Sequence, residues 1–115
     1  MQVRVFQGET IIGSAILAHL DPPMGVAFGP FTPSDKYDRV QHANTVDGIY
    51  VDDFGQSLRV CADQYGDIDA RGIAIEDWMD SLGELHLTVF FADGDDFRAL
   101  FSEYEDYKAY YPNKT

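Results

Sequence analysis

The chain has 115 residues, 45% of them hydrophobic and 14% aromatic, and a formal net charge of −12 at pH 7. This length and apolar content suffice for one domain with an ordinary hydrophobic core and argue against a disordered chain. The negative charge would repel nucleic acid and anionic membranes, so it argues against binding to either and favours a basic protein partner.

Cys61 is the single cysteine, so an internal disulfide is excluded. The first residues lack the basic and then apolar segments of a signal peptide. No run approaches the roughly 18 apolar residues of a membrane helix. We therefore expect a cytoplasmic protein that needs no cofactor.

The first two apolar runs predict a β-hairpin over residues 2–6 and 10–20. Both faces of the second run are mostly apolar, as is typical of a central strand, and we expect a bend at Gly13. A helix over residues 14–20 is the alternative, because alanine and leucine favour helices.

Residues 21–33, DPPMGVAFGPFTP, hold four of the five prolines and still stay largely apolar. The two adjacent prolines end the preceding strand, and a short strand over residues 24–31 follows and pairs with the run at 10–20. One face of this strand carries almost no side chain, since it consists of Gly25, Ala27 and Gly29. Such a face must lie against another backbone, an aromatic ring or a ligand.

This segment resembles one found in small, uncharacterised bacterial proteins, of the form D-P-P-M-G-V-A-x-G-x-F-x-P. The matching residues are Asp21, Pro22, Pro23, Met24, Gly25, Val26, Ala27, Gly29, Phe31 and Pro33. The resemblance implies a small bacterial single-domain protein. It brings no activity, cofactor or catalytic residue with it.

The middle of the chain predicts a short helix and four strands. Thr32 as N-cap and Pro33 at the first position indicate a helix over residues 34–43, with Tyr37 and Val40 facing inward. Strands are expected at 48–51, 56–64, 72–76 and 84–92, and the last alternates most clearly. Residues 77–83 read as a loop or single turn, with Trp78 and Met79 docking on the core.

Apolar residues recur at helical spacing near the C-terminus, at Phe97, Leu100, Phe101 and Tyr104, and predict an amphipathic helix that begins near Asp95. The fold class is therefore α+β: a single domain over residues 1–115. We expect a mostly antiparallel sheet of about five or six strands, packed by the C-terminal helix, with a short helix after Pro33.

Catalytic and metal-binding patterns are weak. The acidic groups at residues 93–96 and 63–69 could bind a divalent cation, but a helix N-terminus and a solvated turn explain them better, and we expect no metal site. His86 lies beside Glu84 and Thr88 on an expected strand. It supports an alternative function, a small enzyme with a His86-centred pocket walled by the small-residue face.

Acidic side chains are concentrated in residues 47–115, which carry sixteen of them against five basic ones. Tyrosines alternate with acids in the last helix, and tyrosine is favoured at protein interfaces. We therefore predict an acidic protein-binding module, of the kind that an immunity protein inhibiting a basic toxin domain would represent. The predicted partner-binding residues are Asp52, Asp53, Glu103, Asp106, Tyr107, Tyr110 and Tyr111. A homodimer of structural role is the remaining alternative.

Overall fold

The computed structural model describes residues 1–50, 58–63, 65–92 and 94–110. Its strands are β1 (Gln2–Gln7), β2 (Thr10–Ile16), β3 (His19–Asp21), β4 (Val26–Pro33), β5 (Thr45–Val46), β6 (Ile49–Tyr50), β7 (Leu58–Ala62), β8 (Gly66–Asp67), β9 (Ala70–Trp78) and β10 (Glu84–Phe91). Its helices are the 3-10 turn η1 (Pro22–Met24), α1 (Arg39–His42), α2 (Met79–Leu82), α3 (Gly94–Phe101) and α4 (Glu105–Tyr110).

Within the described residues these strands form a ten-stranded sheet in the order β6-β5-β9-β10-β4-β2-β1-β7-β8, with β3 beside β4. Among the described strands, every pairing is antiparallel except the one between β5 and β9. The radius of gyration, 14.0 Å, is close to the roughly 13 Å of one compact domain of this length. The prediction of a strand-rich α+β domain is therefore confirmed. The predicted number of strands, five or six, was too low because the shortest strands have too few residues to show an alternating pattern.

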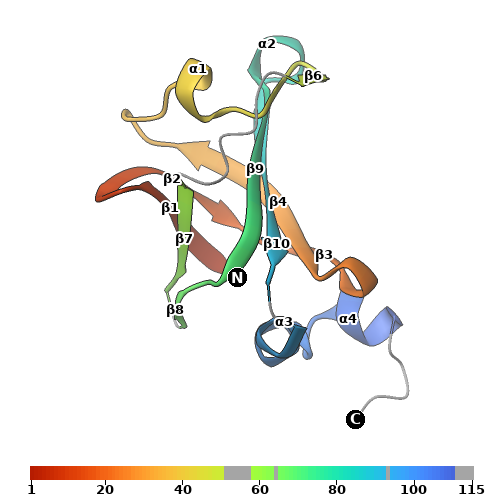
Figure 1. Ribbon diagram of the computed structural model, residues 1–115. Coiled ribbons are helices and arrows are strands. Elements are labelled where there is room, and N and C mark those ends of the chain that lie inside the picture. Colours follow the sequence, from red (N-terminus) through yellow and green to blue (C-terminus); the bar gives the residue numbers. More distant parts are fainter. Residues whose placement is uncertain (51–57, 64, 93, 111–115) are drawn as a thin grey trace.

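The sheet curves strongly around the hydrophobic core (Figure 1). The inward residues of β10, Leu85, Leu87, Val89 and Phe91, are buried as predicted, because side chains alternate across a strand. Ile68, just before β9, donates its N–H to the carbonyl of Val60 in β7 at 2.9 Å. This bond brings the β7 side of the sheet close to the start of β9.

The run at residues 10–20 is two strands, which corrects both the continuous strand and the alternative helix. The chain leaves β2 after Ile16, and buried Leu17 donates its N–H to the carbonyl of Met1 at 2.8 Å. The β1–β2 hairpin is confirmed. Its register shifts between Val5 and Phe6, so the irregularity lies next to Gly13, where a bend was predicted.

Strand β4 joins the two halves of the sheet, since its first part pairs with β3 and β10 and its last part with β2. A Cβ atom on Gly29 would collide with the carbonyl oxygen of Ile16. Ala27 is fully buried, and Gly25 has a φ of 66° as the left-handed C-cap of η1. The small-residue face is therefore explained by close backbone packing and a turn, and it is not an open ligand slot.

The helix predicted over residues 34–43 is only the four-residue α1. Thr32 and Pro33 belong to β4 because their pairing with β2 continues to the end of that strand. Asp38 caps the helix instead, accepting a hydrogen bond from the N–H of Val40 at 2.9 Å. Val40 was predicted to face inward and is 77% exposed.

The C-terminal helix is divided into α3 and α4. Phe97 and Phe101 of α3 pack edge-on against Phe91 of β10, with ring centroids 5.4 and 5.6 Å apart. Tyr104, between the helices, donates its N–H to the carbonyl of Phe101 at 2.9 Å, which closes a turn. In the described part of the chain, no helix is long and apolar enough to cross a membrane.

Candidate functional site

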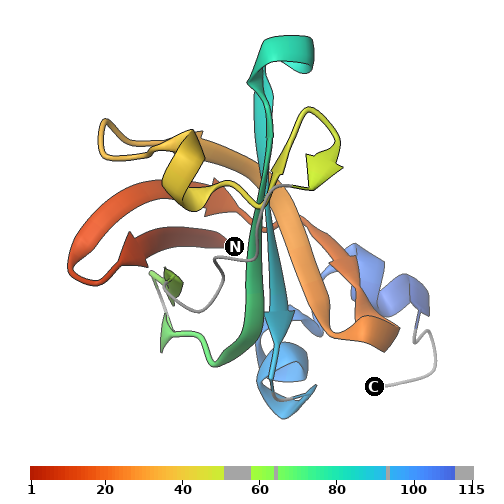
Figure 2. The ribbon, with the colours of Figure 1, turned by 45° about the horizontal axis from the view of Figure 1, so that its top comes forward.

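Three short elements meet at one end of the molecule: α1, the β5–β6 hairpin and α2 (Figures 1 and 2). We call this region, residues 39–42, 45–50 and 79–82, the hairpin–turn end. Asp47 and Gly48 connect the two strands with φ angles of 49° and 85°. An Asp-Gly pair with positive φ at both positions makes the tight turn that two-residue hairpins prefer. A strand was predicted to begin at residue 48, so this turn pattern was overlooked.

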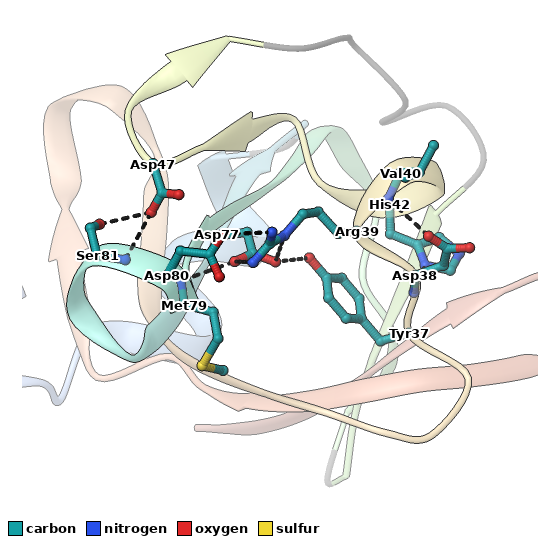
Figure 3. A network of polar contacts seen from close by, with 10 residues as sticks. All are labelled: Tyr37, Asp38, Arg39, Val40, His42, Asp47, Asp77, Met79, Asp80 and Ser81. Carbon is teal, nitrogen blue, oxygen red and sulfur yellow. Dashed lines mark hydrogen bonds and ion pairs between the residues drawn. The ribbon is translucent and has the colours of Figure 1, made fainter.

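The carboxylate of Asp77, only 2% exposed, is the centre of a polar network at this end (Figure 3). The Arg39 guanidinium donates to both of its oxygens, at 3.1 and 3.2 Å. The Tyr37 hydroxyl donates to it at 2.7 Å and the Met79 N–H at 3.0 Å. A buried carboxylate with four donors remains ionised and holds its neighbours in place.

The pKa values in this network follow from these contacts. Burial alone would raise the pKa of Asp77, but the hydrogen bonds from Arg39, Met79 and Tyr37 outweigh burial and lower it. Burial, followed by the hydrogen bond to Asp77, raises the pKa of Tyr37. Both side chains are therefore held in their ordinary charge states at neutral pH.

The network ties the three elements together. Arg39 of α1 also pairs with Asp80 of α2 at 3.0 Å. Ser81 of α2 donates its N–H and its hydroxyl to one carboxylate oxygen of Asp47, at 3.2 and 2.7 Å (Figure 3). The Asp47 N–H donates to the carbonyl of Asp77 at 2.8 Å. These contacts consequently hold α1, the β5–β6 hairpin and α2 in one fixed arrangement.

His42, the last residue of α1, connects this helix to Asp38 and to Gln7 of β1. It is 2% exposed, and its Nδ1 accepts the N–H of Asp38 at 2.9 Å. Its Nε2 lies 2.8 Å from the side-chain oxygen of Gln7, so the proton is on Nε2. Burial lowers the pKa of His42, which keeps the ring neutral.

Large apolar side chains project from this rigid end. Ile49 is 71% exposed, Tyr50 67% and Leu82 62%. With Val40 and Met79 they make up half of the exposed large hydrophobic residues in the described part of the chain. Met79 was predicted to dock on the core, and its exposure corrects that prediction. Exposed apolar groups held on a fixed platform are typical of a contact surface.

The predicted partner-binding residues lie away from the hairpin–turn end or outside the described residues. Asp52, Asp53 and Tyr111 are not among the described residues, and neither is the side chain of Tyr110. Glu103 is exposed and pairs with Lys108 at 3.3 Å. Asp106 accepts the N–H of Leu20 at 3.1 Å beside an open groove. Tyr107, also predicted to bind a partner, is partly buried against the core and packs on Phe97.

His86 lies on β10, and its Nε2 is 3.2 Å from the carboxylate of Glu84. Its side chain is 38% exposed, and it does not line the groove beside Asp106. Of the residues expected to wall its pocket, Gly29 packs against the backbone of Ile16, Ala27 is fully buried, and Gly25 caps η1. Ala27 and Gly29 therefore do not wall a pocket beside His86.

Sequence reasoning missed Asp77 and its partners because Tyr37 and Arg39 lie about forty residues from it and no short motif connects them. The Asp47–Gly48 dipeptide was the available signal for the hairpin. In comparisons with protein-family models, with curated proteins and with solved structures, no match to this chain was found.

Proposed function

We propose that this protein is an acidic protein-binding module that contacts a basic partner through its hairpin–turn end. The observation that carries this proposal is that Ile49, Tyr50 and Leu82, all largely exposed, lie on elements that the Asp77 network locks together. Specific interfaces combine an apolar centre with a polar rim. This end has both.

Rigidity supports the same function. Association loses free energy when loops and side chains become ordered, and a surface that is already ordered loses less. Here a hairpin of two-residue strands and a single helical turn would be mobile in isolation. The bonds from Ser81 to Asp47 and from Arg39 to Asp77 hold them before any partner arrives.

Charge indicates the kind of partner. Residues 34–50 and 76–84, which include the apolar side chains, contain six carboxylates besides the buried Asp77, against one lysine and one arginine. An acidic rim steers a basic protein toward the surface and disfavours a second acidic copy of this chain. An immunity-type inhibitor that covers a basic toxin domain is the specific form that we propose.

The experiment is affinity capture from a lysate of the source organism with elution in salt steps. Three baits are compared: the wild-type protein, the double variant I49S/L82S, and the matched control I11S/I16S, which removes two partly exposed isoleucines from β2. We expect the wild type and the control to retain one basic protein that raised salt releases, and the double variant to lose it.

Two results would contradict the proposal. If I49S/L82S captures the partner as well as the control does, the hairpin–turn end is not the contact surface. If native mass shows a wild-type dimer that I49S/L82S dissociates, the apolar residues serve self-association. Circular dichroism of each bait establishes that it is folded.

A further inference from the structure

An open groove of about 560 Å³ lies near α4, away from the hairpin–turn end. Its lining comes from the end of β3, from η1, from β4 and from α4. The 21–33 segment and the acidic last helix, which lie far apart in the sequence, therefore form one concave site. Nothing in the function proposed above uses this site.

The walls of the groove are fixed by internal contacts. The carboxylate of Asp106 joins α4 to β3 through the N–H of Leu20 at 3.1 Å. Gly25 caps η1 by donating its N–H to the carbonyl of Pro22 at 3.1 Å, and its own carbonyl accepts from Phe91 at 2.9 Å. The Phe28 ring stacks on His19 with centroids 5.4 Å apart. The groove is thus formed without a ligand.

Two carboxylates border an otherwise apolar lining. Within the described residues the Asp21 side chain makes no capping hydrogen bond to η1. Asp106 uses one oxygen in its bond to Leu20, and its other oxygen is not part of that bond. Pro22, Pro23, Phe28 and Ala109 supply the apolar part. Such a lining matches a long side chain with an apolar stem and a cationic head.

The protein's own arginines show how such a head is held. The Arg59 guanidinium lies 4.4 Å from the centroid of the Phe6 ring and pairs with Asp67 at 2.9 Å. The groove offers the same two partners, an aromatic ring in Phe28 and carboxylates in Asp21 and Asp106. A planar guanidinium stacks on a ring and bonds a carboxylate at once, which an ammonium group does less well.

We propose that the groove binds an arginine side chain of an extended basic peptide segment. The guanidinium stacks on the Phe28 ring and pairs with Asp21 and Asp106, and the stem lies over the two prolines. This site is independent of the hairpin–turn end, so I49S/L82S should leave peptide binding unchanged.

The test uses a blocked pentapeptide with one central arginine between alanines, and amide chemical shifts of the ¹⁵N-labelled protein. We expect saturable shifts at millimolar peptide for Leu20, Phe28 and Ala109. The same peptide with citrulline in place of arginine has the same shape without the charge, and it should give no saturable shift at these residues.

Variants of single carboxylates test which of them bind the arginine of the peptide. D21N and D106N are isosteric, and the asparagine of D106N keeps an acceptor for the N–H of Leu20. Each should raise the Kd by about three- to tenfold, as loss of one charged hydrogen bond predicts. E9Q removes the same charge from the exposed β1–β2 turn, and it should leave the Kd unchanged.

Equal binding of the citrulline peptide would overturn the proposal, and that comparison needs no variant. Shifts confined to the hairpin–turn end, or no shift in the groove at all, would overturn it too. If E9Q weakens binding as much as D21N, the peptide is attracted by the net charge and not by this groove.

Discussion

The guanidinium of Arg39 donates hydrogen bonds to both carboxylate oxygens of Asp77, at 3.1 and 3.2 Å, across 38 residues of sequence. This pair connects α1 to the end of β9. The apolar side chains of the hairpin–turn end are positioned by the elements that this pair holds. Its removal should therefore change stability and surface order together.

Replacing Asp77 with alanine should destabilise the fold. The change removes the acceptor that Tyr37 and Arg39 share, although Arg39 keeps its pair with Asp80, and loss of one partner of a buried ion pair costs about 3–5 kcal/mol. Because Arg39 is partly exposed, we expect a loss of about 3 kcal/mol in the free energy of unfolding, measured by urea denaturation. The control D67A breaks an exposed pair with Arg59 and should cost less than about 1 kcal/mol. Equal losses in the two variants would contradict the central place of Asp77.

His42 should make stability depend on pH near neutrality. Its pKa in the folded protein is lowered, so its contribution is present above the ordinary value of about 6.5 and is lost as pH falls through the folded value. Asparagine can still accept the N–H of Asp38 and does not titrate. H42N should therefore be less stable at pH 7 and should lose less stability than the wild type between pH 7 and pH 5. If the urea midpoints of H42N and the wild type fall equally between pH 7 and pH 5, His42 does not cause the pH dependence.

Tyr37 should make stability decline in alkali. Its pKa in the folded protein is raised, so its contribution is complete below the ordinary value of about 10 and decreases as pH rises beyond it. Y37F removes the ionisable hydroxyl and its bond to Asp77. We expect Y37F to be less stable than the wild type at pH 7 and to lose less stability between pH 9 and pH 11. Thermal melting at each pH measures both effects. A variant with the wild-type slope would show that Tyr37 does not cause the decline.

Gly29 should not tolerate a side chain. A Cβ atom at this position would overlap the carbonyl oxygen of Ile16, which is backbone and has no rotamer to yield. We expect G29A to lower the free energy of unfolding by about 1–3 kcal/mol or more. G94A is the control, because a Cβ there meets no atom within 4 Å and alanine favours helices. A G29A protein as stable as G94A would mean that β4 and Ile16 are not in contact.

The sequence predicted the strands that alternate and failed where tertiary contacts decide. Leu85, Leu87 and Val89 alternate with polar residues, so β10 could be located from periodicity alone. Thr32 and Pro33 have a helix-start pattern, but pairing with β2 keeps them in a strand. Local preference is weak compared with a paired strand, which is why this element was misplaced.

The candidate sites were predictable only in part. Asp106 was singled out from charge, yet its neighbours in the groove come from residues 20–28, and no sequence spacing reports that proximity. Asp77 was placed in a loop, because its burial depends on Arg39 and Tyr37 folding over it. The sequence did not predict that Ile49 and Leu82 are exposed, because isolated apolar residues are usually assigned to the core.

The most direct test of the proposed function is amide hydrogen exchange of this protein free and in complex with its captured basic partner. The account predicts slower exchange in the complex at residues 47–50 and 79–83, and no change in β1, β2 or β7. Protection confined to other surfaces, with residues 47–50 and 79–83 exchanging as in the free protein, would contradict it.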